Sequence, residues 1–132
     1  MHILVVDDSS TMRRILCKTL ARLGFSHTSE AANGHAALEQ IKAAPVDLVI
    51  VDWHMPGMSG IELVRAIRST PATQQVPVLM VTANAAPDDI VRAAQSGITS
   101  YVVKPFTGET LARKVADAIG GAGPDSPQSQ PR

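Results

Sequence analysis

The chain lacks several features that particular protein classes require. It contains one cysteine, Cys17, so no internal disulfide can form, and a reducing compartment such as the cytoplasm is expected. Its formal net charge is zero, which argues against DNA binding because nucleic-acid-binding domains normally present a basic surface. No apolar run approaches the roughly 20 residues that cross a membrane. The N-terminus also lacks the pattern of a secretory signal.

The chain does have the length and apolar content of one folded domain. Its 132 residues are 45% hydrophobic and 18% charged, which is typical of a globular protein. We expect this domain to span residues 1–120. Residues 121–132 are rich in proline, glycine and glutamine, and we expect them to form a disordered tail.

Short apolar runs alternate with segments of helical periodicity. Most of the runs are continuously apolar, as in strands that are buried on both faces of a parallel sheet. Five strands in strict alternation with five helices predict an α/β fold, a three-layer (βα)5 sandwich. Either Ser9 or Ser10 is expected to cap the first helix. The strands are predicted at 2–6, 26–30 (the weakest), 47–51, 77–81 and 100–103.

Polar side chains stand where four of these apolar runs end. Asp7 and Asp8 follow the first run, Asp52 the third, Thr82 the fourth and Lys104 the fifth. The carboxyl ends of parallel strands lie along one edge of the sheet, where binding sites form. We therefore expect these five side chains to converge.

The convergent side chains suit phosphoryl chemistry. Carboxylates in one cleft repel one another, and Mg²⁺, which prefers oxygen ligands, relieves that repulsion. Together with the Lys104 ammonium and the Thr82 hydroxyl, the metal could hold a phosphoryl group. The sequence has neither a GxxxxGK[ST] nor a GxGxxG motif, so a nucleotide site is not supported. Asp52, alone at the end of the middle strand, is the best candidate to accept the phosphoryl group as an acyl phosphate.

Because it carries these residues at the ends of its predicted strands, the sequence resembles a response-regulator receiver domain. Within that family it is most similar to the single-domain, CheY-like chemotaxis regulators. The resemblance covers residues 2 to about 120 and rests on "VVDDSSTMRR", "VDWHMPGMSGIEL", "VPVLMVTAN" and "GITSYVVKPFTGETL". It implies a flavodoxin-like parallel sheet of strand order 2-1-3-4-5. It also implies a cis peptide bond between Lys104 and Pro105.

The resemblance also implies how the site works. A sensor histidine kinase or a phosphotransfer domain would pass a phosphoryl group to Asp52 in a Mg²⁺-dependent reaction. Asp7, Asp8, Asp52 and the backbone carbonyl of His54 would hold the ion. The domain would catalyse only its own phosphorylation and dephosphorylation, and would act as a cytoplasmic signalling switch without a separate substrate.

Thr82, Lys104 and Tyr101 are the remaining residues to which the resemblance gives roles. Lys104 would pair with the phosphoryl group and Thr82 would bond to it. The inward shift of Thr82 would leave space into which Tyr101 swings. This movement would alter the face formed by the fourth helix, fifth strand and fifth helix, which an output protein binds.

Two positions depart from the pattern of the chemotaxis regulators. His54 and Asn84 each stand two residues beyond a site residue, where those relatives carry Asn and Glu. Both positions flank the path of an attacking water, so we expect His54 and Asn84 to tune the lifetime of the phosphoryl group. Protonation of His54 near neutral pH would make hydrolysis pH-dependent.

The fourth helix opens with Pro87, Asp88 and Asp89, near the point where chemotaxis regulators carry lysines on the surface that binds the motor. These acids weaken the case for the flagellar motor switch, which stays one candidate output partner.

Two other functions are considered. A phosphohydrolase with an aspartyl intermediate needs an acid two residues beyond Asp52, and that position holds His54. A flavin-binding electron carrier of similar fold would have to place its phosphate at an acidic rim, and the chain has only four Phe, Trp and Tyr residues. Turnover of a phosphomonoester would favour the first function, and a colourless protein would exclude the second.

Overall fold

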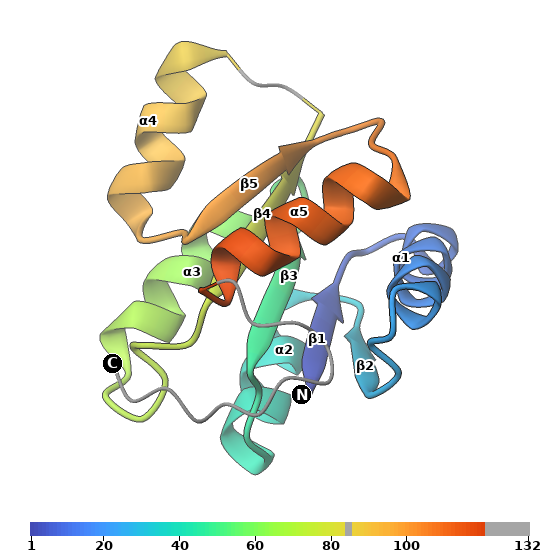
Figure 1. Cartoon of the computed structure of the whole chain (residues 1–132). Helices are drawn as coiled ribbons and strands as arrows, with labels where there is room; N and C mark the ends of the chain where they lie inside the picture. Colours follow the sequence, from blue (N-terminus) through green and yellow to red (C-terminus); the bar gives the residue numbers. More distant parts are fainter. Residues whose placement is uncertain (84–85, 121–132) are drawn as a thin grey trace.

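A computed structural model describes residues 1–83 and 86–120 of the chain (Figure 1). The predicted site residue Asn84 and the predicted tail, 121–132, lie outside these described residues. Within the described ranges, no helix has the length and apolar character needed to span a membrane.

Five parallel strands form one sheet in the order β2-β1-β3-β4-β5. This result confirms the predicted fold class and strand order. The central strands β1, β3 and β4 are buried along their whole length, which explains their unbroken apolar sequences. The bounds are β1 (Ile3–Val6), β2 (Thr28–Ala31), β3 (Leu48–Asp52), β4 (Val78–Thr82) and β5 (Ser100–Val103).

In the described part of the chain, four helices connect successive strands and a fifth follows β5, and together they cover both faces of the sheet (Figure 1). They are α1 (Ser10–Arg22), α2 (Gly34–Ala43), α3 (Gly60–Ser69), α4 (Pro87–Ser96) and α5 (Gly108–Ala118). Ser9, one of the two predicted caps of α1, accepts a hydrogen bond from the amide of Met12. Asn33, Ser59 and Thr107 cap α2, α3 and α5 in the same way.

The sheet separates two apolar layers. Successive strand residues point to opposite faces, so Ile3 and Val5 pack against α1 and α5. Leu4 and Val6 belong instead to the layer under α2, α3 and α4. The predicted three-layer sandwich is thereby confirmed.

Strand β2 departs most from its predicted bounds. The pattern predicted a strand over 26–30, whereas the strand runs from Thr28 to Ala31. β2 lies at the edge of the sheet and is partly exposed, so polar residues are tolerated there and the apolar signal is weak.

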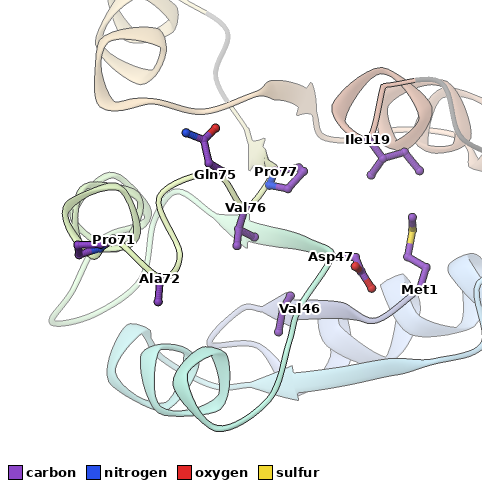
Figure 2. Close-up of a pocket in the computed structure, with 9 residues that line it drawn as sticks. All are labelled: Met1, Val46, Asp47, Pro71, Ala72, Gln75, Val76, Pro77 and Ile119. Atoms are coloured by element: carbon purple, nitrogen blue, oxygen red, sulfur yellow. The ribbon is translucent and has the colours of Figure 1, made fainter. Parts of the chain in front are cut away.

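A cavity of about 340 Å³ lies at the amino ends of the strands, the opposite edge from the predicted site (Figure 2). Val46, Val76, Pro77 and Ile119 give it a largely apolar lining. Its one carboxylate, Asp47, accepts the backbone N–H of His2 at 2.7 Å. The carboxylate therefore serves to fix the N-terminus of the chain against the start of β3.

Candidate functional site

Three carboxylates meet at the carboxyl edge of the sheet. Asp7 and Asp8 follow β1, and Asp52 is the last residue of β3. Each offers an oxygen, and these three oxygens lie within 4.8 Å of one another. Asp7 and Asp52 are 2% and 7% exposed, whereas Asp8 is exposed to solvent. The parallel topology thus brings together the acidic residues that the sequence placed at separate strand ends.

The surroundings of Asp7 raise its pKa. Burial raises the pKa of Asp7 above its ordinary value, and the negative charges of Asp52 and Asp8 add to the rise. A hydrogen bond from the Ser9 amide to Asp7 Oδ1, at 2.9 Å, and the charge of Lys104 oppose it. Keeping the Asp7 carboxylate ionised therefore costs free energy, and a bound cation would offset that cost. Clustered carboxylate oxygens are the donors that Mg²⁺ prefers, so the residues present fit that ion.

Lys104 supplies the positive charge beside this cluster. Its Nζ lies 3.2 Å from Asp52 Oδ1, and its backbone N–H donates to the Thr82 carbonyl at 2.8 Å. The peptide bond between Lys104 and Pro105 is cis, as the resemblance implied. Lys104 thus lies beside the carboxylate proposed to accept phosphate.

The two predicted switch residues lie on neighbouring strands. Thr82 ends β4 and is 1% exposed, while Tyr101 on β5 is half-buried. Tyr101 pairs in register with Met80, two residues before Thr82. Lys114 Nζ lies 5.1 Å from the centroid of the Tyr101 ring, close enough for a cation–π contact. An α5 cation therefore stabilises the present position of the ring.

The loop after β3 folds tightly against the end of that strand. Gly60, the first residue of α3, donates its N–H to the Trp53 carbonyl at 2.8 Å, and a Cβ at Gly60 would lie 2.5 Å from the Asp52 carbonyl oxygen. Sequence reasoning did not assign Gly60 a role, although a glycine directly after a helix cap was a usable signal. His54 is exposed and its ring stacks on Trp53, with centroids 6.0 Å apart.

Arg13 is a second residue near the site that sequence reasoning missed. Its Nη1 donates to the carbonyl of Asp7 at 2.6 Å. Sequence spacing carries no signal for this contact, because it depends on the turn between β1 and α1 bringing the side chain back over the strand end.

Comparison with known proteins identifies the class to which this fold and site belong. The family model described as "Response regulator receiver domain" matches residues 3–116. The chain therefore belongs to the response-regulator receiver family, whose members are signalling domains of two-component systems.

Its relatives agree with this assignment. The chain is 50% identical over 115 residues to chemotaxis protein CheY of Pseudomonas aeruginosa, which covers 87% of this chain and 93% of that protein. It is equally identical to chemotaxis protein CheY-3 of Vibrio cholerae, over 87% and 88% of the two chains. The solved structure of CheY4 of Vibrio cholerae superposes with a TM-score of 0.83 at 34% identity, covering 89% of this chain and 97% of that one. The domain is thus a CheY-like receiver.

Proposed function

We propose that Asp52 accepts a phosphoryl group from the phosphohistidine of a sensor histidine kinase or phosphotransfer domain. A carboxylate oxygen of Asp52 forms the new bond to phosphorus as the bond from phosphorus to the imidazole nitrogen breaks, which leaves an acyl phosphate. The observation that carries this proposal is the group of three carboxylates within 4.8 Å, with Lys104 Nζ 3.2 Å from Asp52.

We propose that Asp7, Asp8, Asp52 and the backbone carbonyl of His54 hold Mg²⁺. The ion, when bound, neutralises charge on the carboxylates and on the phosphoryl oxygens. Lys104 holds the phosphoryl oxygens from the β5 side, since its ammonium already contacts Asp52.

Thr82 and Tyr101 form the proposed switch. A hydrogen bond from the Thr82 hydroxyl to the charged phosphoryl group contributes about 1.5–3 kcal/mol. That energy shifts a two-state equilibrium by about one to two decades. Thr82 and the Tyr101 ring belong to the side of the sheet covered by α4, so their movement alters the surface formed by α4, β5 and α5.

The relatives named chemotaxis proteins support a role in chemotaxis, which we propose for this cytoplasmic switch. The output protein would bind the α4–β5–α5 surface. The flagellar motor switch is one candidate for that partner, although Asp88 and Asp89 in the first turn of α4 weaken the case for it.

A phosphodonor domain has an accessible approach to the site. A largely apolar hollow of about 400 Å³ borders Lys104 and is lined by Met12, Ile15, Pro105 and Phe106. Ile15 is 47% exposed, so it is available to a docking helix.

The direct test is phosphorylation with acetyl phosphate. With Mg²⁺, the intact mass should rise by one phosphoryl group, and Asp52→Asn should abolish the rise. Asp8→Ala and Lys104→Ala should reduce it. An unchanged wild-type mass, or labelling of Asp52→Asn, would overturn the proposal. Turnover of an added phosphomonoester beyond one equivalent would instead identify a phosphohydrolase.

His54 and Asn84 are proposed to set the lifetime of the acyl phosphate. His54→Asn and Asn84→Glu should each change the rate of self-catalysed dephosphorylation after the acetyl phosphate is removed. Rates equal to that of wild type in both variants would contradict the role proposed for these two positions.

A further inference from the structure

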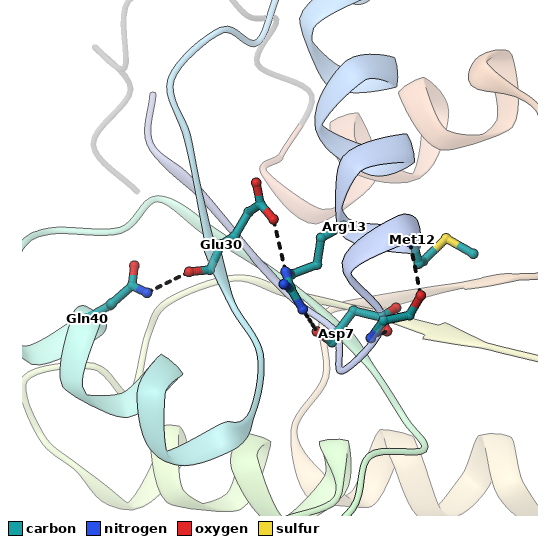
Figure 3. A network of polar contacts seen from close by, with 6 residues as sticks. Asp7, Met12, Arg13, Glu30 and Gln40 are labelled. Atoms are coloured by element: carbon teal, nitrogen blue, oxygen red, sulfur yellow. Dashed lines mark hydrogen bonds and ion pairs between the residues drawn. The ribbon is translucent and has the colours of Figure 1, made fainter.

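The side chain of Arg13, in the first turn of α1, points back toward Asp7 (Figure 3). It is 16% exposed. Its Nη1 donates to the Asp7 carbonyl at 2.6 Å, and its Nε contacts Glu30 Oε1 at 2.9 Å. The guanidinium therefore joins the turn that carries Asp7 and Asp8 to the edge strand β2.

The β2 side of this link is itself held in place. Gln40 on α2 donates its Nε2–H to the Glu30 carbonyl at 2.7 Å (Figure 3). The next residue, Ala31, accepts the Asp7 N–H at 3.1 Å. Asp7 is thus fixed at its backbone N–H by β2, at its carbonyl by Arg13 and at its carboxylate by the Ser9 amide.

The Asp7 carbonyl belongs to the peptide unit that leads into Asp8. Because that unit is planar, a hydrogen bond to its oxygen also sets the direction of the Asp8 N–Cα bond. Asp8 itself is exposed to solvent. Arg13 can therefore determine how the Asp8 carboxylate is presented beside those of Asp7 and Asp52.

The charge of Arg13 and its hydrogen bond to Asp7 predict opposite effects on cation binding when the guanidinium is removed. If only its charge mattered, removing the guanidinium would strengthen binding of a divalent cation, because like charges repel. If its hydrogen bond to the Asp7 carbonyl mattered more, removal would weaken binding. Glu30 pairs with the guanidinium and offsets part of its positive charge, which favours the second effect.

We propose that Arg13 is a positioning residue for the divalent-cation site, and that it acts by fixing the peptide unit between Asp7 and Asp8. This inference rests on the proposed function, in which that site holds Mg²⁺. Glu30 and Gln40 support Arg13 from β2 and α2, so the edge strand contributes to cation affinity without supplying a ligand.

The test is a Mg²⁺ titration of the full chain, followed by Trp53 fluorescence and by calorimetry. Arg13→Ala should weaken Mg²⁺ binding about tenfold, the factor that loss of one hydrogen bond to a carbonyl would give. Arg13→Lys, which retains a donor, should recover part of the affinity. The matched control, Arg14→Ala, removes an equal charge from an exposed neighbour and should leave affinity unchanged or slightly higher.

A second readout needs no metal. Amide exchange at Ser9, whose N–H is bonded to Asp7 Oδ1, should be faster in Mg²⁺-free Arg13→Ala than in Arg14→Ala. Should Arg13→Ala fail to fold, Glu30→Gln provides the test. It removes the ion pair, leaves the Asp7 carbonyl contact available, and should weaken Mg²⁺ binding about two- to threefold because the guanidinium is held less firmly.

The outcomes separate the two proposals. If wild-type protein does not bind Mg²⁺, or Asp8→Ala binds it as well as wild type, the proposed function fails. If wild type binds and Asp8→Ala does not, while Arg13→Ala binds as tightly as Arg14→Ala, the positioning role of Arg13 is overturned.

Discussion

α3 and α4 are adjacent helices of ten residues each, yet they are held in place in different ways. α3 buries five residues and begins with a capping box in which Ser59 and Glu62 bond each other's backbone amides. α4 buries Ala93 and Ser96, and it follows Ala86, whose methyl side chain cannot accept a hydrogen bond. Its start relies on Pro87 and on acids that complement the helix dipole.

The C-terminal end of α4 is the firmly held end. Gly97 ends the helix in the left-handed conformation, with φ 105°. Its carbonyl accepts a hydrogen bond from Arg68 Nε of α3 at 2.9 Å. Arg68 Nη1 also donates to the carbonyls of Gln74 and Val76. α4 is therefore fixed to α3 mainly at its C-terminal end. Because elements with few buried contacts open most readily, we expect α4 to open before α3.

The largest expected effect comes from shortening one apolar side chain on each helix. Ile67 of α3 is fully buried, so Ile67→Ala should lower the free energy of unfolding by about 2–5 kcal/mol. Val91 of α4 is 53% exposed, and Val91→Ala should change it by less than about 0.5 kcal/mol. Urea denaturation measures both, and similar losses would refute the contrast.

Removing the link between the helices should have the next largest effect. Arg68→Ala leaves carbonyls without their donor and should cost about 2 kcal/mol of unfolding free energy. Burial lowers the pKa of Arg68, so part of the hydrogen-bond gain is already offset by desolvation. Hydrogen exchange should accelerate at the C-terminal end of α4. Arg65→Ala, on the exposed side of α3, is the control and should leave this exchange unaltered.

Loss of the N-terminal cap of α3 should lower the free energy of unfolding by less than loss of Arg68. Ser59→Ala removes the acceptor for the Glu62 amide, bonded at 3.2 Å, and should cost about 1 kcal/mol. Calorimetric unfolding would detect this loss. Ser69→Ala at the other end of α3 should cost clearly less, since its hydroxyl bonds a carbonyl within the same helix.

The smallest expected effect is a gain. Ala86→Ser would give α4 the side-chain cap that α3 has, and should stabilise the protein by about 0.5 kcal/mol. Amide exchange in the first turn of α4 should slow. Ala83→Ser, at an exposed position before the helix, should give no such protection. Equal protection in both variants would mean that capping is not the cause.

Sequence patterns could predict the acidic site because it follows from topology. Asp7, Asp8 and Asp52 come together wherever parallel strands share a carboxyl edge, so knowing the strand ends was sufficient. The start of α4 was equally predictable from its proline and acids.

The contacts around the site could not be predicted in this way. Arg13 meets Glu30 across 17 positions of sequence, and this pairing depends on side-chain reach rather than on periodicity. The bounds of β2 were also hard to predict. Polar contacts hold part of this strand, and such contacts leave no apolar pattern in the sequence.

The two apolar layers described above have a consequence for engineering. Leu20 and Val115 lie on one side of the sheet, and Ile67 and Ala93 on the other. Substitutions across such a divider share no partners, so their effects on stability should simply add. The α1–α5 side could therefore be redesigned for higher stability without disturbing the packing beneath α4.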